Sequence, residues 1–195
     1  MISNLVSKDF ENYLLNKCNA EKIEEIDLSC IEEISLNAIN EKGNLCDYDF
    51  KDFQKLNRLK YVSLQNFIIN NYETNIINRC KSIEGLQMTN CIIKSKSRLQ
   101  NNIKVISFEN CKMFRMYYIS LLKRIQVLKL YSLKSVNLKD IAYLKQIEKI
   151  CFENEKIVNL RKLLLLKYLT KIKMVNCKYN KIAELKLEKY IEIEK

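Results

Sequence analysis

A nine-residue pattern recurs along the chain and constrains its fold more than any other feature of the sequence. The pattern is apolar-x-x-apolar-x-apolar-x-Asn-Cys, and six segments follow it in full or in part: LKYVSLQNF (59–67), IEGLQMTNC (83–91), IKVISFENC (103–111), IQVLKLYSL (125–133), IEKICFENE (147–155) and LTKIKMVNC (169–177). The second apolar residues are spaced by 24, 20, 22, 22 and 22 positions: Val62, Leu86, Ile106, Leu128, Ile150 and Ile172. A fixed period in the twenties predicts stacked equivalent units, each covering its neighbour's apolar face.

Each copy of the pattern predicts a short strand followed by a tight turn. Side chains alternate along a strand, so Ile106 and Phe108 are expected to point inward and Ser107 outward. The cysteine that ends the pattern, as at Cys111, suits a small apolar position at the inner corner of the turn. The asparagine before it tolerates a left-handed backbone. Glu155 holds the corner position in one copy, and since a buried carboxylate is costly we expect that turn to open to water.

The segments between the strands carry apolar residues three positions apart, as at Ile141, Leu144 and Ile147. This spacing favours 3-10 or extended returns. Over about residues 53–182 the pattern resembles the leucine-rich repeats of the short class found in protein-phosphatase regulatory subunits and in a spliceosomal leucine-rich subunit. The resemblance implies an α/β solenoid, with a curved parallel β-sheet on the concave face and short 3-10, extended or helical returns on the convex face.

The length of 195 residues favours a single domain. We expect an N-terminal capping helix within residues 1–20, where Val6, Phe10 and Leu14 share one helical face behind Ser7 as a cap. A repeat domain is expected over 21–182, with six clear repeats from residue 53 and one or two irregular repeats before them. Residues 183–195 are expected to form a cap or a final strand. Two registers compete for the first strand, through Ile26 or Ile34, and we favour Ile26.

Composition argues against enzymatic chemistry. The chain has no histidine and only two glycines, so a histidine-activated nucleophile and a glycine-rich phosphate loop are both excluded. None of the eight cysteines lies in a Cys-x-x-Cys pair, so we expect no metal, no cofactor and no small-molecule substrate. We find no signal peptide and no apolar stretch of about 18 residues, and expect no membrane contact. The protein is therefore predicted to be intracellular with reduced thiols, cytoplasmic or alternatively nuclear. Cys151 is expected on the outward face of its strand, where it would be the most accessible thiol.

The outward positions of the predicted strands form the candidate binding surface. Tyr61 and Tyr131 are either aromatic anchors for a partner or simply favoured strand residues. Lysines at adjacent outward positions, such as Lys149 beside Lys171, repel each other unless Glu153 or an acidic ligand offsets them. The candidate partner-binding residues are Tyr61, Gln65, Gln87, Glu109, Lys129, Tyr131, Lys149, Glu153, Lys171 and Lys173.

Charge is unevenly distributed along the chain. Residues 1–93 contain 10 Lys/Arg and 14 Asp/Glu, a net charge of −4, whereas residues 94–195 contain 24 and 9, a net charge of +15, which together give +11. In a solenoid, position along the chain is position in space, so one end is acidic and the other basic. We therefore predict a non-catalytic module that binds another protein, one with an acidic surface, on the concave face. The alternative is a protein that binds RNA or a ribonucleoprotein through its basic C-terminal half.

Overall fold

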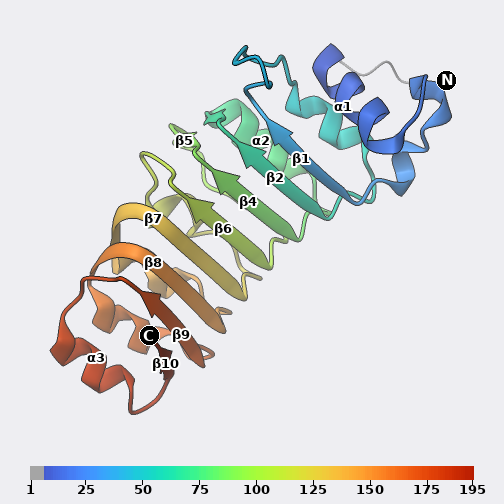
Figure 1. The fold of residues 1–195 in the computed structure, drawn as a ribbon. Coiled ribbons are helices and arrows are strands. Elements are labelled where there is room, and N and C mark those ends of the chain that lie inside the picture. The colour runs from blue at the N-terminus through green and yellow to red at the C-terminus, as the bar shows by residue number, and fades with distance from the viewer. Residues whose placement is uncertain (1–6) are drawn as a thin grey trace.

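A computed structural model describes residues 7–195, except for the side chains of 182 and 183, and shows a curved stack of parallel strands (Figure 1). Val6 lies outside the described residues. Eight strands form one sheet in the order β1-β2-β4-β6-β7-β8-β9-β10. Their bounds are Glu33–Asn37 (β1), Tyr61–Gln65 (β2), Gly85–Thr89 (β4), Val105–Glu109 (β6), Val127–Asn137 (β7), Lys149–Val158 (β8), Lys171–Val175 (β9) and Glu192–Glu194 (β10).

The strand register follows the sequence repeat. Val62 lies opposite Leu86, Leu86 opposite Ile106 and Ile106 opposite Leu128, and the same row continues through Ile150 and Ile172. Each of these side chains is at most 2% exposed. The alternation of buried and exposed positions along each strand therefore places one apolar side in a continuous core and the other on the concave face. The predicted α/β solenoid is confirmed.

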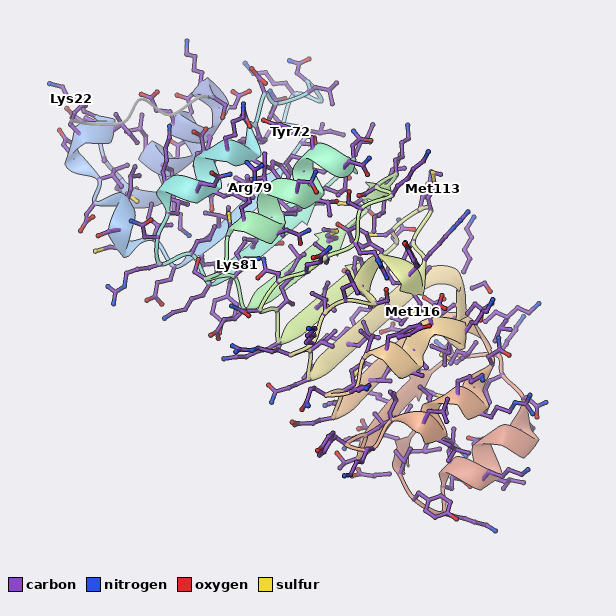
Figure 2. All side chains as sticks on the ribbon, turned by 180° about the vertical axis from the view of Figure 1, so that it is seen from behind. Lys22, Tyr72, Arg79, Lys81, Met113 and Met116 are labelled. Carbon is purple, nitrogen blue, oxygen red and sulfur yellow. The ribbon has the colours of Figure 1, made fainter. Side chains whose placement is uncertain are left out.

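The returns on the convex side are mostly 3-10 helices, as the three-residue spacing predicts. They are η3 (Phe50–Lys55), η4 (Met116–Ile119), η5 (Leu138–Tyr143) and η6 (Leu160–Leu165). The repeat of 24 residues instead holds an α-helix, α2 (Asn71–Arg79), because two additional residues make room for it. Figure 2 shows α2, with Tyr72 and Arg79, on the side away from the sheet. Two short strands, β3 (Ile68–Ile69) and β5 (Ile92–Ile93), pair beside it.

The first repeat uses the register through Ile34, so the preferred register through Ile26 is wrong. Ile34 is fully buried in β1 and lies opposite Val62. Ile26 instead occupies the C-cap position directly after η1 (Ile23–Glu25), and η2 (Leu28–Cys30) follows. The reason is visible in the spacing, since Ile23 and Ile26 are three positions apart, as in the other returns, whereas Ile34 and Leu36 alternate.

Helical segments lie at both ends of the sheet. Helix α1 (Lys8–Cys18) buries Phe10 and Leu14. Ser7 begins this helix but does not cap it through its side chain; its hydroxyl and its backbone N–H both donate to Asp52 Oδ2 at 3.1 Å. At the other end α3 (Lys181–Leu187) precedes β10, which pairs with β9.

The asparagine and cysteine of each repeat hold the turn after the strand. Asn66, Asn90, Asn110, Asn154 and Asn176 all have positive φ, between 49° and 63°. The Asn110 side-chain amide donates to Asn90 Oδ1 at 2.7 Å, which links neighbouring turns. The Cys111 thiol lies in the inner corner and donates to the Met88 carbonyl at 3.3 Å. Asparagine therefore supplies the left-handed bend, and cysteine fills the corner below it.

The turn at Glu155 does not open to water, contrary to expectation. Glu155 is 2% exposed; its Oε1 accepts the Leu133 N–H at 2.5 Å, and its Oε2 has no hydrogen-bond partner among the described residues. Strands β7 and β8 continue past this turn after an irregularity between Tyr131 and Lys134, and so cover the corner. Burial raises the pKa of Glu155 to about 7.

Cys151 lies on the outward face of its strand, as predicted, but it is not the most accessible thiol. It occupies a concave position between Lys129 and Lys173 but is only 5% exposed. The exposed thiols are instead Cys18 and Cys30 at the N-terminal end. The hydrogen bond to Asp27 raises the pKa of the Cys30 thiol and so lowers its reactivity.

We expect Cys18 to react first with an alkylating reagent in the folded protein, followed by Cys30. Cys80, Cys111 and Cys151 are buried and should resist until the protein unfolds. Timed alkylation followed by peptide mass spectrometry measures this order, and labelling in denaturant provides the control for intrinsic reactivity. Modification of Cys151 as fast as that of Cys18 would contradict the burial of the concave centre.

Candidate partner-binding surface

The concave face carries all ten candidate residues, and each of them is at least partly exposed. They fall on three parallel rows, which run across the strands at the first, third and fifth strand positions. Four are exposed, namely Tyr61, Gln65, Gln87 and Glu109. Six are half-buried, namely Lys129, Tyr131, Lys149, Glu153, Lys171 and Lys173. The structure thus brings them onto one face, although not into one cluster.

A hollow of about 400 Å³ lies on this face over β2, β4 and β6. Its floor is formed around Gly85, its sides include Tyr61 and Val105, and Lys129 lies at its far end. Tyr61 is 49% exposed and Val105 36% exposed, so apolar surface faces the hollow. The hollow therefore combines an apolar wall with a cation, Lys129, at its β7 end and a carboxylate, Glu33, at its β1 end. The cationic end suits a partner segment with an apolar side chain next to a carboxylate.

Gly85 lines this hollow but is not among the candidate residues predicted from the sequence. A Cβ at position 85 would lie 2.5 Å from Tyr61 Cδ1 and 3.0 Å from Cε1, so the tyrosine ring leans over the glycine. The signal was available, since glycine inside a strand often marks the close approach of another group. Gly85 is the only glycine at an expected strand position in this chain.

Two of the four candidate lysines have acidic partners within the chain, and these partners are neither Glu153 nor an external ligand. The Lys171 ammonium lies 2.8 Å from Glu192 and 3.2 Å from Glu194, and Lys173 lies 2.8 Å from Glu194. The glutamates raise the pKa of both lysines, and the lysines lower that of Glu194. The cause is strand β10, whose register places its glutamates beside β9.

Lys129 and Lys149 differ from these two lysines. Within the described part of the chain, neither has a carboxylate within 4 Å of its ammonium group. Both are half-buried on neighbouring strands, in different rows of the concave face. They are the concave cations that remain available to an acidic group.

Tyr131 shares strand β7 with Lys129 but does not line the hollow, and it has a different environment from Tyr61. Tyr131 occupies the fifth strand position of β7, between Glu109 on β6 and Glu153 on β8. Tyr61 occupies the first strand position of β2, which lies two strands before β6 in the sheet. Burial raises the pKa of Tyr131, and the nearby Cys151 thiol adds to the effect. Because it is half-buried among neighbours, Tyr131 offers less free surface than Tyr61.

The described residues contain no group of three or more His, Cys, Asp or Glu placed to hold a metal ion. In the same part of the chain, no helix is long and apolar enough to cross a membrane.

Comparison with known proteins supports the fold. The chain matches no protein-family model. No curated protein matches it either. Among solved structures it is similar to internalin C2 from Listeria monocytogenes, with a TM-score of 0.56 and 15% sequence identity over 97% of this chain and 93% of that one. The fold is therefore that of a leucine-rich repeat protein. At this level of identity, the likeness concerns the fold alone.

Proposed function

We propose that this protein is a non-catalytic interaction module, and that it binds a partner protein on its concave face. The observation that carries the proposal is the hollow over Gly85, whose lining combines the exposed ring of Tyr61, the side chain of Val105 and Lys129, a cation without an ion pair among the described residues. Buried aromatic side chains with a polar surround are typical of the residues that dominate protein interfaces. The partner is expected to offer an apolar side chain to the hollow and a carboxylate to Lys129 or Lys149.

On the concave face a protein fits better than RNA. The internal pairing of Lys171 and Lys173 leaves two cations there, Lys129 and Lys149, while Glu109 and Glu153 lie on the same surface. RNA binding needs a row of cations for the phosphates and exposed aromatic faces for the bases. The mixed charge of this face instead suits the polar rim of a protein interface.

Two further parts of the proposal concern class and compartment. The near-constant spacing and the Asn-Cys turns support the proposal that the repeats are of the short class, as in the phosphatase regulatory subunits. All eight cysteines are free thiols, and Cys18 and Cys30 are exposed, which suits a reducing intracellular environment.

Gly85→Ala should weaken binding of the partner while leaving the fold intact. The new methyl group would displace the ring of Tyr61 and fill the floor of the hollow, yet alanine is tolerated in a strand at least as well as glycine. Tyr61→Ala should weaken binding by about 2 kcal/mol, as expected for an anchor residue. The measurement is affinity purification from native lysate with and without nuclease, followed by titration of the recovered partner.

Tyr143→Ala provides the matched control, because Tyr143 is 66% exposed at the end of η5 on the convex side. This variant should bind as the unmodified protein does. Full binding by Gly85→Ala and Tyr61→Ala together would exclude the concave hollow. Loss of all recovered proteins after nuclease treatment would overturn the assignment of a protein partner.

A further inference from the structure

A second row of lysines lies outside the concave face, at the long edge of the solenoid where the strands end. We call it the ending edge. Lys112, Lys134, Lys156 and Lys178 each follow the inner-corner position of a repeat and are spaced by 22 residues. The earlier repeats carry Ile68 and Ile92 at the same place. The row therefore begins in the middle of the stack and runs to its basic end.

The structure leaves all four of these side chains exposed. The backbones of Lys156 and Lys178 form a parallel β-bridge, as do those of Lys112 and Ile92 of the preceding repeat. Lys134 is displaced by one residue in the register and lies opposite Glu155. At ~4.8 Å per strand, the row spans about 14 Å. Among the described residues, none of the four has a carboxylate within 4 Å of its ammonium group.

The turns that carry this row are almost free of acidic residues. The four segments 110–115, 132–137, 154–159 and 176–181 contain one acidic residue, Glu155, whose carboxylate is buried. The same segments contain two further cations, Arg115 and Lys181, and both are exposed. Like charges stacked at this spacing repel one another, so the arrangement costs stability unless a ligand neutralises it.

The opposite long edge, where the strands start, also carries lysines at a 22-residue period, but its charges are mixed. The lysines are Lys123, Lys145, Lys167 and Lys189. On this starting edge Lys104 forms an ion pair with Glu84 at 2.9 Å, and Gln126 donates to Glu148 at 3.1 Å. Figure 2 shows Met113, the neighbour of Lys112, and Lys81 at opposite long edges of the molecule. Among the described residues, the row on the ending edge therefore has no exposed carboxylate interspersed in its turns, unlike the starting edge.

A hollow of about 310 Å³ adjoins the lysine row between the turns that carry Lys112 and Lys134. Phe114, Met116 and Val136 supply its apolar lining. Its polar groups include the Arg115 guanidinium, the Ser135 hydroxyl and the Asp140 carboxylate. A flat apolar ring with hydrogen-bonding groups at its rim suits such a lining, and the carboxylate can accept from an exocyclic amino group.

We propose that the ending edge binds single-stranded nucleic acid, with backbone phosphates along the lysine row and one base in the hollow beside Arg115 and Asp140. A row one side chain wide fits a linear polyanion better than a broad membrane surface. Asp140 in the hollow repels the carboxylates of an acidic peptide, whereas it can accept a hydrogen bond from a base. This surface is separate from the concave hollow, so the inference does not depend on the proposed protein partner.

The test is fluorescence anisotropy with labelled 12-nucleotide homopolymers of single-stranded DNA and RNA at several salt concentrations. With four phosphate contacts, the slope of log K against log salt should be about −3, at ~0.7 per contact for a single strand. Replacing Lys112, Lys134, Lys156 and Lys178 by Ser should remove most of this slope and lower affinity at least about tenfold at low salt. Asp140→Ala should change the preference among homopolymers without changing the slope.

The matched control replaces Lys123, Lys145, Lys167 and Lys189 by Ser, which removes the same charge at the same period from the starting edge. This variant should keep most of the affinity. Equal losses in the two quadruple variants would show that only net charge matters and would overturn the site, as would absence of binding. Equally tight binding of a polyglutamate peptide or of anionic lipid vesicles would overturn the assignment to nucleic acid. Single Lys156→Ser and Lys145→Ser variants repeat the comparison if a quadruple variant fails to fold.

Discussion

Leu128→Asp should abolish the cooperative fold of the protein. Leu128 is fully buried at the centre of the sheet, opposite Ile106 on one side and Ile150 on the other. An unpaired carboxylate at this position would lie in the apolar core, and the cost of burying it reaches several kcal/mol or more. Since the whole stability of a domain is about 5–15 kcal/mol, we expect loss of the sheet signal in circular dichroism and no cooperative melting transition.

Val127→Asp is the control for this substitution, because Val127 precedes Leu128 in the same strand but is half-buried on the concave face. The new carboxylate can reach water there, so the melting temperature should change little. If both variants melted alike, side chains 127 and 128 would not occupy opposite faces of the sheet. The repeat phase described above would then be wrong.

Glu155→Cys should stabilise the protein at neutral and alkaline pH and flatten its pH dependence. The folded-state pKa of Glu155, about 7, lies above its ordinary value of 4.5. Below pH ~4.5 the carboxyl is protonated in both states and the folded protein keeps its full stability. As the pH rises from about 4.5 to 7, the carboxyl loses its proton in the unfolded state but keeps it in the folded state, so stability falls, by up to about 3 kcal/mol at 1.36 kcal/mol per pKa unit. Above pH 7 the carboxyl is ionised in both states and the loss levels off.

Cysteine is the chosen replacement because Cys91, Cys111 and Cys177 hold the same corner in other repeats. The free energy of unfolding, measured with denaturant at pH 5 and pH 8, should fall with pH in the unmodified protein and much less in the variant. Glu153→Gln, which changes a half-exposed carboxylate on the concave face, should leave the difference between the two pH values in place. An unaltered pH dependence in Glu155→Cys would mean that the carboxyl is hydrated in solution.

The solenoid could be predicted from the sequence because the same strand-and-turn pattern recurs six times at a near-constant spacing. The spacing alone predicts the buried row through Leu86, Ile106 and Leu128, and the same spacing in the other repeats supports this assignment. The asparagine turns were predictable for the same reason. The first strand has no such support, since Ile26 and Ile34 each fit a local pattern. The decisive difference is that Ile34 alternates with Leu36, whereas Ile26 follows the three-residue spacing of a return.

The details of the concave face were less predictable, because they depend on which side chain covers which neighbour. Alternation places Cys151 on the outward side but does not predict that only 5% of the residue is exposed there. Likewise, the partners of Lys171 and Lys173 depend on the register of β10, a strand of three residues without a clear repeat signal. The hollow over Gly85 could be sought from the glycine itself, since a glycine inside a strand often marks a close approach, but the repeat pattern of apolar residues does not predict it.

The order of the strands has a mechanical consequence. Each strand of the sheet pairs only with its predecessor and its successor, from β1 at one end to β10 at the other (Figure 1). A force that pulls the two ends apart along the stack therefore passes through every strand interface in series, and each interface bears the whole load. Resistance to extension is set by the weakest interface and does not grow with the number of repeats. The junction of β9 and β10, with three paired residues, is the shortest in the sheet and would yield first.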